Sequence, residues 1–412
     1  MLRAGRALML GLVVVAVSGL DGRRTAASEI APATSFLAFG ARIAGDDART
    51  RIVIDFDRRP EYSVHYVANP PRIVVDLPET AFGFPSTDLE PRGLFRDIRY
   101  GAMGEGSARL VLTTAKPARL ALSEVRADEG GKGYRLVLDA ESVSDAAFAD
   151  LVKSHEWEVA ALAPAAAARG DRVAIEPGKP SDAFVIAIDA GHGGIDAGAS
   201  GVETKTEEKN VTLAFARTLV ERLNKEPGIS AVLTRDKDEF LALSQRVQIA
   251  RQHKAGLLVS LHADTLRQKN IRGATIYTLS ENASDTLAAN LAARENLSDE
   301  IAGIRLTEEP EEVADILLDL TRRETQAFSI TMARAIVESF EGQIGLINNP
   351  HRFAGFRVLQ APDVPSILLE LGFLSNKDDE KLLLDENWRK QVAELLTEAV
   401  KRYRAPVIAK GG

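Results

Sequence analysis

Residues 184–199 read FVIAIDAGHGGIDAGA, a short apolar run followed at once by a loop rich in glycine and alanine. A run of this length, bounded by glycine, is typical of a buried strand in an α/β sheet. Glycine lets the backbone fold tightly, so we expect the loop to leave the imidazole of His192 exposed at the strand end. In open α/β sheets, this is the edge where ligands bind.

The segments after this stretch alternate between strand and helix patterns. Such alternation predicts an α/β domain with a twisted, mainly parallel sheet flanked by helices. We place this domain at residues 183–405. Its expected strands are 184–188, 231–233, 257–261 and 366–371, and its clearest helical patterns are 211–223 and 392–400.

Residues 35–145 follow a different pattern, in which apolar residues recur at every second position and proline or glycine pairs separate the runs. This pattern predicts a small N-terminal all-β sandwich domain. It contains one histidine, His65, and no cluster of acids near it in sequence, which favours binding or a structural role over catalysis. Typical runs are Ile52, Ile54 and Phe56, then Ile73, Val75 and Leu77, then Tyr134, Leu136 and Leu138.

Length and composition agree with two folded domains. The chain has 412 residues, more than one core usually organises, and its 45% hydrophobic and 27% charged residues are ordinary for a globular protein. A net charge of −8 argues against a nucleic-acid partner. Because the chain has no cysteine, disulfides, a lipoprotein anchor and thiolate metal sites are excluded, and any metal must bind to histidine and carboxylate.

The remaining segments are a leader and a linker. Arg3 and Arg6 precede an apolar run from Ala7 to Leu20, which predicts a signal peptide at 1–27 and export without stable membrane insertion, although an uncleaved anchor is an alternative. Residues 146–182, rich in alanine, proline and glycine at 161–180, are expected to be the linker between the two domains.

His262 ends the apolar run LLVSLHAD in the same way that His192 follows its strand. One histidine at a strand end is more often structural, but two in equivalent places favour a metal site. Catalytic zinc takes three protein ligands and leaves one position open. Glu208, at the start of the expected helix, is the candidate third ligand, although its neighbour Glu207 and a plain helix-dipole role for Glu208 remain open.

Glu370 lies in PSILLELGFLSN, among apolar residues where an ionisable group is costly unless it has a partner or a task. A buried acid beside a metal acts as a general base, which is the role we predict for Glu370. The alternative is a structural ion pair, for example with Arg357.

Four of these motifs, DAGHGGIDAG, EEKNVTL, SLHAD and LLELGFLSN, together resemble the zinc-dependent N-acetylmuramoyl-L-alanine amidases of the bacterial cell wall. TRIVIDFDRRPEYSVHYVANPPRIVVDLPET is similar to the AMIN domain that often precedes them and targets them to peptidoglycan. The resemblance implies zinc ligands at His192, Glu208 and His262 and a catalytic Glu370, and it favours Glu208 over Glu207. Asp189, Asp196 and Asn376 lie within the motifs as candidates for orienting the ligands.

The resemblance implies a periplasmic enzyme that hydrolyses the amide between N-acetylmuramic acid and the L-alanine of peptidoglycan stem peptides, in cell-wall remodelling and daughter-cell separation. Two alternatives stay open. One is another zinc peptidase that cuts within the stem peptide, and the other is a peptidoglycan-binding protein without activity.

Residues 281–325 are extra relative to compact members of the family, and Leu287, Leu291 and Ile301 form a single apolar stripe along the beginning of this insert. By resemblance to the division-associated amidases, the insert is a regulatory helix, and Glu295 is the candidate that occupies the open zinc position. A LytM-type activator would then displace it. The alternative is that Glu295 is an exposed helix residue.

Overall fold

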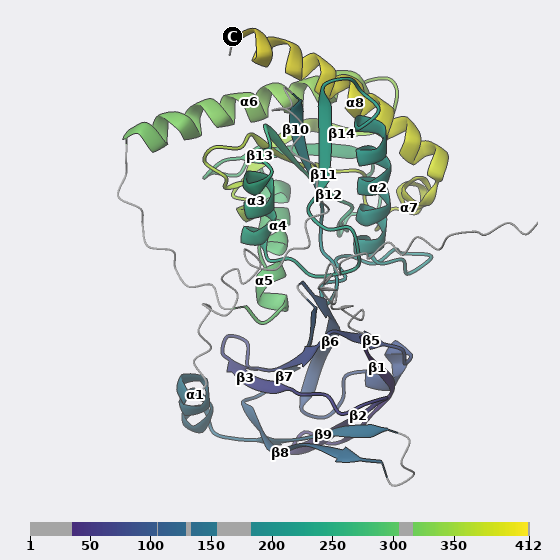
Figure 1. The fold of residues 1–412 in the computed structure, drawn as a ribbon, viewed down its shortest axis with the longest axis vertical. Helices are drawn as coiled ribbons and strands as arrows, with labels where there is room; N and C mark the ends of the chain where they lie inside the picture. The colour runs from purple at the N-terminus through teal and green to yellow at the C-terminus, as the bar shows by residue number, and fades with distance from the viewer. Residues whose placement is uncertain (1–34, 105, 129–132, 155–182, 305–315, 411–412) are drawn as a thin grey trace, which may run out of the picture. The chain divides into compact units, whose positions relative to one another are not determined.

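The computed structural model describes residues 35–104, 106–128, 133–154, 183–304 and 316–410 (Figure 1). The expected signal peptide at 1–27 lies outside these residues. No helix in the described ranges combines the length and apolar character needed to cross a membrane.

The N-terminal domain consists of two antiparallel sheets whose inward side chains share one core, as the period-two pattern predicts. One sheet has the order β5-β1-β2-β9-β8 and the other the order β3-β4-β7-β6; β5 joins the first sheet by a parallel pairing with β1. The strands are β1 Phe36–Gly45, β2 Arg49–Phe56, β3 Ser63–Val67, β4 Arg72–Pro78, β5 Thr80–Phe82, β6 Phe95–Met103, β7 Ser107–Thr114, β8 Ala118–Ala127 and β9 Tyr134–Ser142, with a short 3-10 helix η1 at Ser86–Leu89.

The expected linker at 146–182 is corrected at its start. Helix α1 spans Asp145–Ser154 and belongs to the β domain, because Phe148 is buried and packs edge-on against Tyr66 with ring centroids 6.0 Å apart. Leu151 and Val152 extend the same apolar stripe against this core. The rest of the predicted linker, 155–182, lies outside the described residues.

The second domain contains the expected, mainly parallel sheet, in the order β11-β10-β12-β15-β13-β14. Each strand runs parallel to at least one neighbour, and β13 also pairs antiparallel with β15. The strands are β10 Phe184–Ala190, β11 Ile229–Leu233, β12 Leu257–His262, β13 Ala274–Leu279, β14 Leu346–Ala354 and β15 Ser366–Glu370.

Helices cover both faces of this sheet (Figure 1). On one face, a large apolar core joins the sheet to α2, α6, α7 and α8. On the other face, smaller cores join it to α3, α4 and η4. The helices are α2 Glu208–Leu223, α3 Leu243–Gln252, α4 Thr286–Glu295, α5 Ser298–Ile301, α6 Ile316–Phe340, η4 Arg357–Leu359, α7 Lys377–Leu384 and α8 Glu386–Lys410.

The expected regulatory insert, 281–325, contains α4 and α5. Leu291 and Ala288 bury the inner face of α4 against η4 and the sheet. Residues 305–315 lie outside the described residues. Helix α6 begins within the expected range but continues to Phe340, whose side chain lies in the main core, so the end of the predicted insert at 325 is not an element boundary.

We expect Phe148→Ala to lower the free energy of unfolding by about 3 kcal/mol, because it empties a buried aromatic site between α1 and the β sandwich. Urea unfolding of the full chain measures the change. The control is Asp150→Ala on the exposed side of the same helix, which should change stability little. Equal effects of the two substitutions would contradict the docking of α1.

Candidate functional site

Two of the predicted residues end neighbouring strands. His262 is the last residue of β12 and Glu370 the last of β15, and the parallel register pairs these two positions directly. The carboxyl ends of β10, β12 and β15 meet at one edge of the sheet. The site therefore begins where the α/β fold places ligand sites.

His192 reaches the same edge from the glycine loop that follows β10, but the expectation of an exposed imidazole is wrong, because Glu208 and Glu295 pack against the ring and bury it. The φ of His192 is +61°, and two of the loop's glycines leave room that a side chain would fill. A Cβ on Gly191 would lie 2.5 Å from Cε1 of His262, and one on Gly198 would lie 2.7 Å from Cδ2 of His192. Glycine is therefore required at these two positions for the imidazoles to sit this close to the backbone.

Glu208 is the first residue of α2 and is fully buried. Backbone N–H groups hold both of its carboxylate oxygens: that of Ala199 donates to Oε2 at 2.9 Å, and that of Ala263 donates to Oε1 at 2.8 Å. Oε2 lies 3.2 Å from Nε2 of His192, and Oε1 lies 3.2 Å from Nδ1 of His262. The carboxylate therefore faces both imidazoles from a fixed position.

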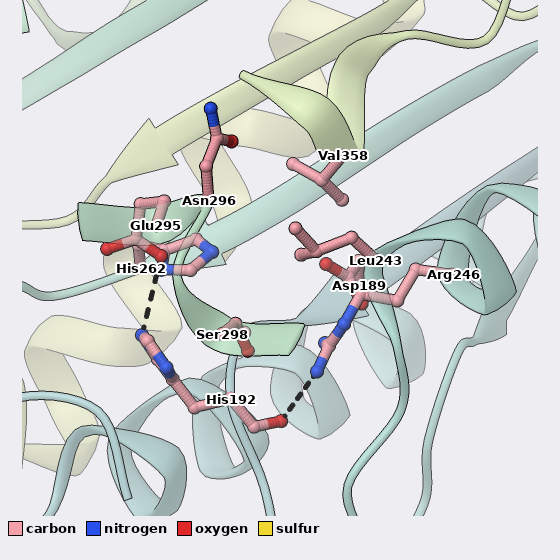
Figure 2. Close-up of a pocket in the computed structure, with 10 residues that line it drawn as sticks. Asp189, His192, Leu243, Arg246, His262, Glu295, Asn296, Ser298 and Val358 are labelled. Atoms are coloured by element: carbon pink, nitrogen blue, oxygen red, sulfur yellow. Dashed lines mark hydrogen bonds and ion pairs between the residues drawn. The ribbon is translucent and has the colours of Figure 1, made fainter. Parts of the chain in front are cut away.

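Glu295, at the end of α4, completes the cluster. Its side chain is buried, and Oε2 lies 3.0 Å from Nδ1 of His262 and 3.6 Å from Nε2 of His192. Figure 2 shows His192, His262 and Glu295 pointing toward one another. The structure therefore excludes the alternative that Glu295 is an exposed helix residue.

The imidazole atoms that face this cluster are suited to a metal ion. Nε2 of His192 and Nδ1 of His262 are buried and accept or donate no hydrogen bond within the described structure. Ligand atoms of His192, His262 and Glu295 lie within 4.8 Å of one another. Glu208 is not a member of that group of three residues. Its carboxylate oxygens nevertheless lie 3.2 Å from Nε2 of His192 and 3.2 Å from Nδ1 of His262, so it belongs to the same cluster.

The separations also agree with zinc. Four ligand atoms about 2.1 Å from a tetrahedral zinc lie roughly 3.4 Å apart. The distances between carboxylate oxygens and imidazole nitrogens in the cluster run from 3.0 to 3.6 Å. Two histidines and two glutamates therefore form a donor set that can surround one zinc ion.

Comparisons with known proteins agree with this geometry. Residues 186–402 match the N-acetylmuramoyl-L-alanine amidase family, and residues 40–138 match the AMIN domain. The first match spans all but the first two residues of the sheet and every residue of the cluster.

The chain belongs to the N-acetylmuramoyl-L-alanine amidases.

The amidase is similar to two AmiC amidases over most of its length. It is 31% identical to amidase AmiC of Escherichia coli, over 86% of this chain and 87% of the relative, and 31% identical to amidase AmiC of Neisseria meningitidis, over 90% and 91%. Amidase AmiA of Escherichia coli is 37% identical over 53% of this chain and 75% of its own. These relatives establish an enzyme that acts on peptidoglycan.

Opposing charges dominate the electrostatics of the amidase site. Burial by itself would lower the pKa of His192, but the carboxylates of Glu208 and Asp196 outweigh it and raise that pKa well above its ordinary value. Burial would raise the pKa of Glu208, but the charges of His192 and His262 lower it well below the ordinary range. Carboxylates that stabilise the protonated, positively charged form of two buried imidazoles also stabilise a metal cation at the same place.

Glu370 lies beside this cluster but has a different environment. Oε2 accepts a hydrogen bond from the backbone N–H of Asp264 at 3.0 Å, whereas Oε1 is buried without a partner in the described structure. Burial, followed by the charges of Asp264, Glu208 and Glu295, raises the pKa of Glu370 well above its ordinary value. The alternative pairing with Arg357 is not formed; the backbone N–H of Arg357 instead donates to Asn296.

The three residues predicted to orient the ligands have different roles. Asp196 contacts a histidine directly, since its Oδ2 lies 2.9 Å from Nδ1 of His192. Asn376 caps helix α7 by accepting backbone N–H bonds from Asp378 and Asp379. Asp189 instead accepts hydrogen bonds from Thr234, Ser260 and an arginine.

Sequence reasoning missed Arg246, the arginine that pairs with Asp189. This arginine on α3 is buried and donates to Asp189 at 2.8 Å, to the carbonyl of Ala190 at 2.8 Å and to the carbonyl of His192 at 2.9 Å. Figure 2 shows the last of these contacts. Nothing in the spacing of Arg246 along α3 distinguishes it from an exposed helix arginine, so only the fold reveals its role.

We expect Asp196→Asn to weaken zinc binding by about 10- to 100-fold, because Asn at this position no longer fixes the tautomer of His192 with a charged acceptor. Competition with a chromophoric chelator measures the zinc Kd. The matched control is Asp238→Asn, since Asp238 accepts hydrogen bonds from Gly194 and Lys209 rather than from a histidine. Equal zinc affinities for the two variants would contradict a positioning role for Asp196.

Proposed function

We propose that this protein is an autoinhibited zinc amidase, with His192, Glu208 and His262 as the zinc ligands and Glu370 as the proton-transfer group. The proposal rests chiefly on the two buried imidazole nitrogens of His192 and His262, which have no hydrogen-bond partner in the described part of the chain and face carboxylates at ligand distance. The bond cut is the amide between the lactyl group of N-acetylmuramic acid and L-alanine.

Zinc, when bound, polarises the scissile carbonyl and lowers the pKa of the attacking water. Glu370 takes a proton from that water as its oxygen bonds to the carbonyl carbon, and then donates a proton to the amide nitrogen as the C–N bond breaks. The products are a carboxylate on the sugar side and a free amine on L-alanine. The unpartnered Oε1 of Glu370 is the oxygen suited to this transfer.

Glu295 keeps this site closed in the proposal. Catalytic zinc needs a free coordination position, and four protein ligands make the closed type of site that structural zinc uses. The proposal that Glu295 is the fourth ligand is supported by its Oε2, which lies 3.0 Å from Nδ1 of His262 and 3.6 Å from Nε2 of His192. The amidase would then be inactive until α4 moves.

Three contacts around Glu295 fasten the segment that carries it. A guanidinium nitrogen of Arg294 lies 2.5 Å from Oδ2 of Asp264. Burial and then the charges of Glu295 and Glu208 raise the pKa of Asp264 to about 7. The Ser298 hydroxyl donates to Asp196 at 2.6 Å. Asp299 accepts the backbone N–H of Leu243 at 3.0 Å.

An activator must displace this segment. Moving the equilibrium from 1% to 99% open takes roughly 5.5 kcal/mol of differential binding, which lies within the reach of a protein partner. By resemblance to the division-associated amidases, we propose a LytM-type activator.

We further propose that the chain acts in the periplasm, in cell-wall remodelling and daughter-cell separation. Residues 1–27 would direct export. The β domain would target the enzyme to peptidoglycan, as its resemblance to AMIN domains implies, with residues 155–182 linking it to the amidase domain.

We expect Glu295→Ala to raise the hydrolysis of purified sacculi by isolated enzyme at least about tenfold, because it frees a zinc position in a largely closed population. The control is Glu281→Ala, an exposed glutamate of the same insert. Release of soluble stem peptides measures the rate. Unchanged activity of Glu295→Ala, with zinc content intact, would contradict autoinhibition by this residue.

We expect Glu370→Gln in the Glu295→Ala background to lower kcat/KM by about 10²- to 10⁴-fold, because the amide cannot take a proton from water. Zinc content should stay the same. The expected products of the parent enzyme are intact stem peptides with a free L-alanine amine and no new reducing sugar. Shortened stem peptides would instead identify a carboxypeptidase or endopeptidase. If the protein binds zinc but releases no product, the remaining interpretation is a peptidoglycan-binding protein without activity.

A further inference from the structure

The outer face of the β5-β1-β2-β9-β8 sheet carries six arginines, which we call the arginine face. They alternate with inward apolar residues, so their side chains all lie on the side away from the sandwich core. The arginines are Arg42 on β1, Arg49 and Arg51 on β2, Arg119 and Arg126 on β8, and Arg135 on β9.

Strand register arranges these arginines in rows with acidic residues. In one row, Glu141 of β9 stands directly opposite both Arg49 of β2 and Arg119 of β8. In the next row, Arg51 stands opposite Asp139, and its Nε and one terminal nitrogen each donate to that carboxylate at 2.5 Å. The guanidinium groups are therefore held at fixed points on the sheet surface.

The arginines form the outer layer of this surface, and the acids lie beneath them. Side-chain exposure of the six arginines runs from 42% to 66%. The acids that pair with them are only 13% to 33% exposed, so an approaching partner meets guanidinium groups first. These acids are Asp55, Glu124, Asp128, Asp139 and Glu141.

This face also differs in charge from the rest of the chain. Six arginines outnumber the five acids that pair with them, whereas the whole chain has a net charge of −8. Exposed ion pairs contribute little to stability, so folding alone does not account for such a concentration of arginines. A guanidinium has five N–H donors, and a bidentate ion pair uses two of them, which leaves donors for a second anion.

We propose that the arginine face binds the carboxylate groups of peptidoglycan stem peptides; this rests on the proposed function of the β domain in targeting the amidase to its polymer. A planar guanidinium matches a carboxylate with two parallel hydrogen bonds. Stem peptides repeat along each glycan strand and carry free carboxylates, so a surface with several fixed guanidiniums can bind several stems at once.

One apolar feature borders the face. Phe39 and Leu37 on β1 are 49% and 41% exposed. Phe39 lies beside Gly40, which pairs with Asp55 of β2, one of the acids beneath the arginine face. Together they offer an apolar surface for the methyl groups and sugar rings that accompany the carboxylates.

The test measures co-sedimentation of the full chain with purified sacculi, in a Glu370→Ala background so that the polymer is not consumed. The variant Arg49→Gln, Arg51→Gln and Arg119→Gln, combined with Asp139→Asn and Glu141→Gln, removes three arginines without leaving unpaired acids. We expect its affinity to fall about tenfold, because several charge-assisted contacts are lost. Sacculi whose carboxyl groups have been amidated should bind the parent protein as weakly as native sacculi bind this variant.

The control removes lysines that are equally exposed and ion-paired but lie on the amidase domain, Lys225→Gln with Glu221→Gln and Lys390→Gln with Glu386→Gln. This variant should bind sacculi like the parent. Circular dichroism and urea unfolding verify that the arginine variant folds.

Three results would overturn the proposal: equal sacculus binding by the arginine variant and the parent, equal binding of native and amidated sacculi, or stronger arginine-dependent binding to phosphatidylglycerol vesicles than to sacculi. The last would identify a membrane surface as the partner. Stem-peptide release by the Glu295→Ala enzyme is measured separately. A negative result for binding by the arginine face therefore does not affect the test of amidase activity.

Discussion

The amidase site depends on one buried ion pair, between Asp189 of β10 and Arg246 of α3. Asp189 also accepts hydrogen bonds from Thr234, which directly follows β11, and from Ser260 of β12, so it contacts both strands beside β10. Arg246 in turn donates to the carbonyl of His192. Because the pair is fully buried, each charge is stable only while the other is in place. This ion pair and its hydrogen bonds thus connect β10, β11 and β12 with α3 and fix the backbone position of His192.

Around this frame, the proposed blocking segment and the proposed catalytic groups contact the same residues. Oδ2 of Asp196 accepts from both His192 and Ser298. The backbone N–H of Asp264 donates to Glu370, and its side chain pairs with Arg294. In the proposed mechanism, closure therefore depends on the same residues that position the candidate metal ligands and Glu370. A segment attached only by apolar packing would leave the metal site unaltered when it moved away.

The sequence predicted that the candidate residues at strand ends lie at one edge of the sheet, because a parallel sheet brings such residues together whatever the loops between them. His192, His262 and Glu370 follow from that rule, whereas the choice of Glu208 over Glu207 required family resemblance. Glu295 required family resemblance, since the apolar stripe of α4 does not reveal which polar residue turns inward. Arg246 and α1 were missed because their burial depends on tertiary contacts. The sequence does not show that Arg246 pairs with Asp189, or that the helix following the β domain packs back on it. Strand β14 is half-exposed and contains the polar sequence NNPHR, so no alternation marks it.

In the proposed autoinhibited state, the contact of Glu295 with both histidines also links zinc binding and closure thermodynamically. A ligand that binds one conformation more tightly shifts the equilibrium toward it, and the coupling is reciprocal. If zinc gains a fourth protein ligand in the closed form, then zinc strengthens closure and closure strengthens zinc binding by the same factor. Under that proposal, closure by α4 would help to retain the metal, and an activator would work against the metal as well as against the protein packing around α4.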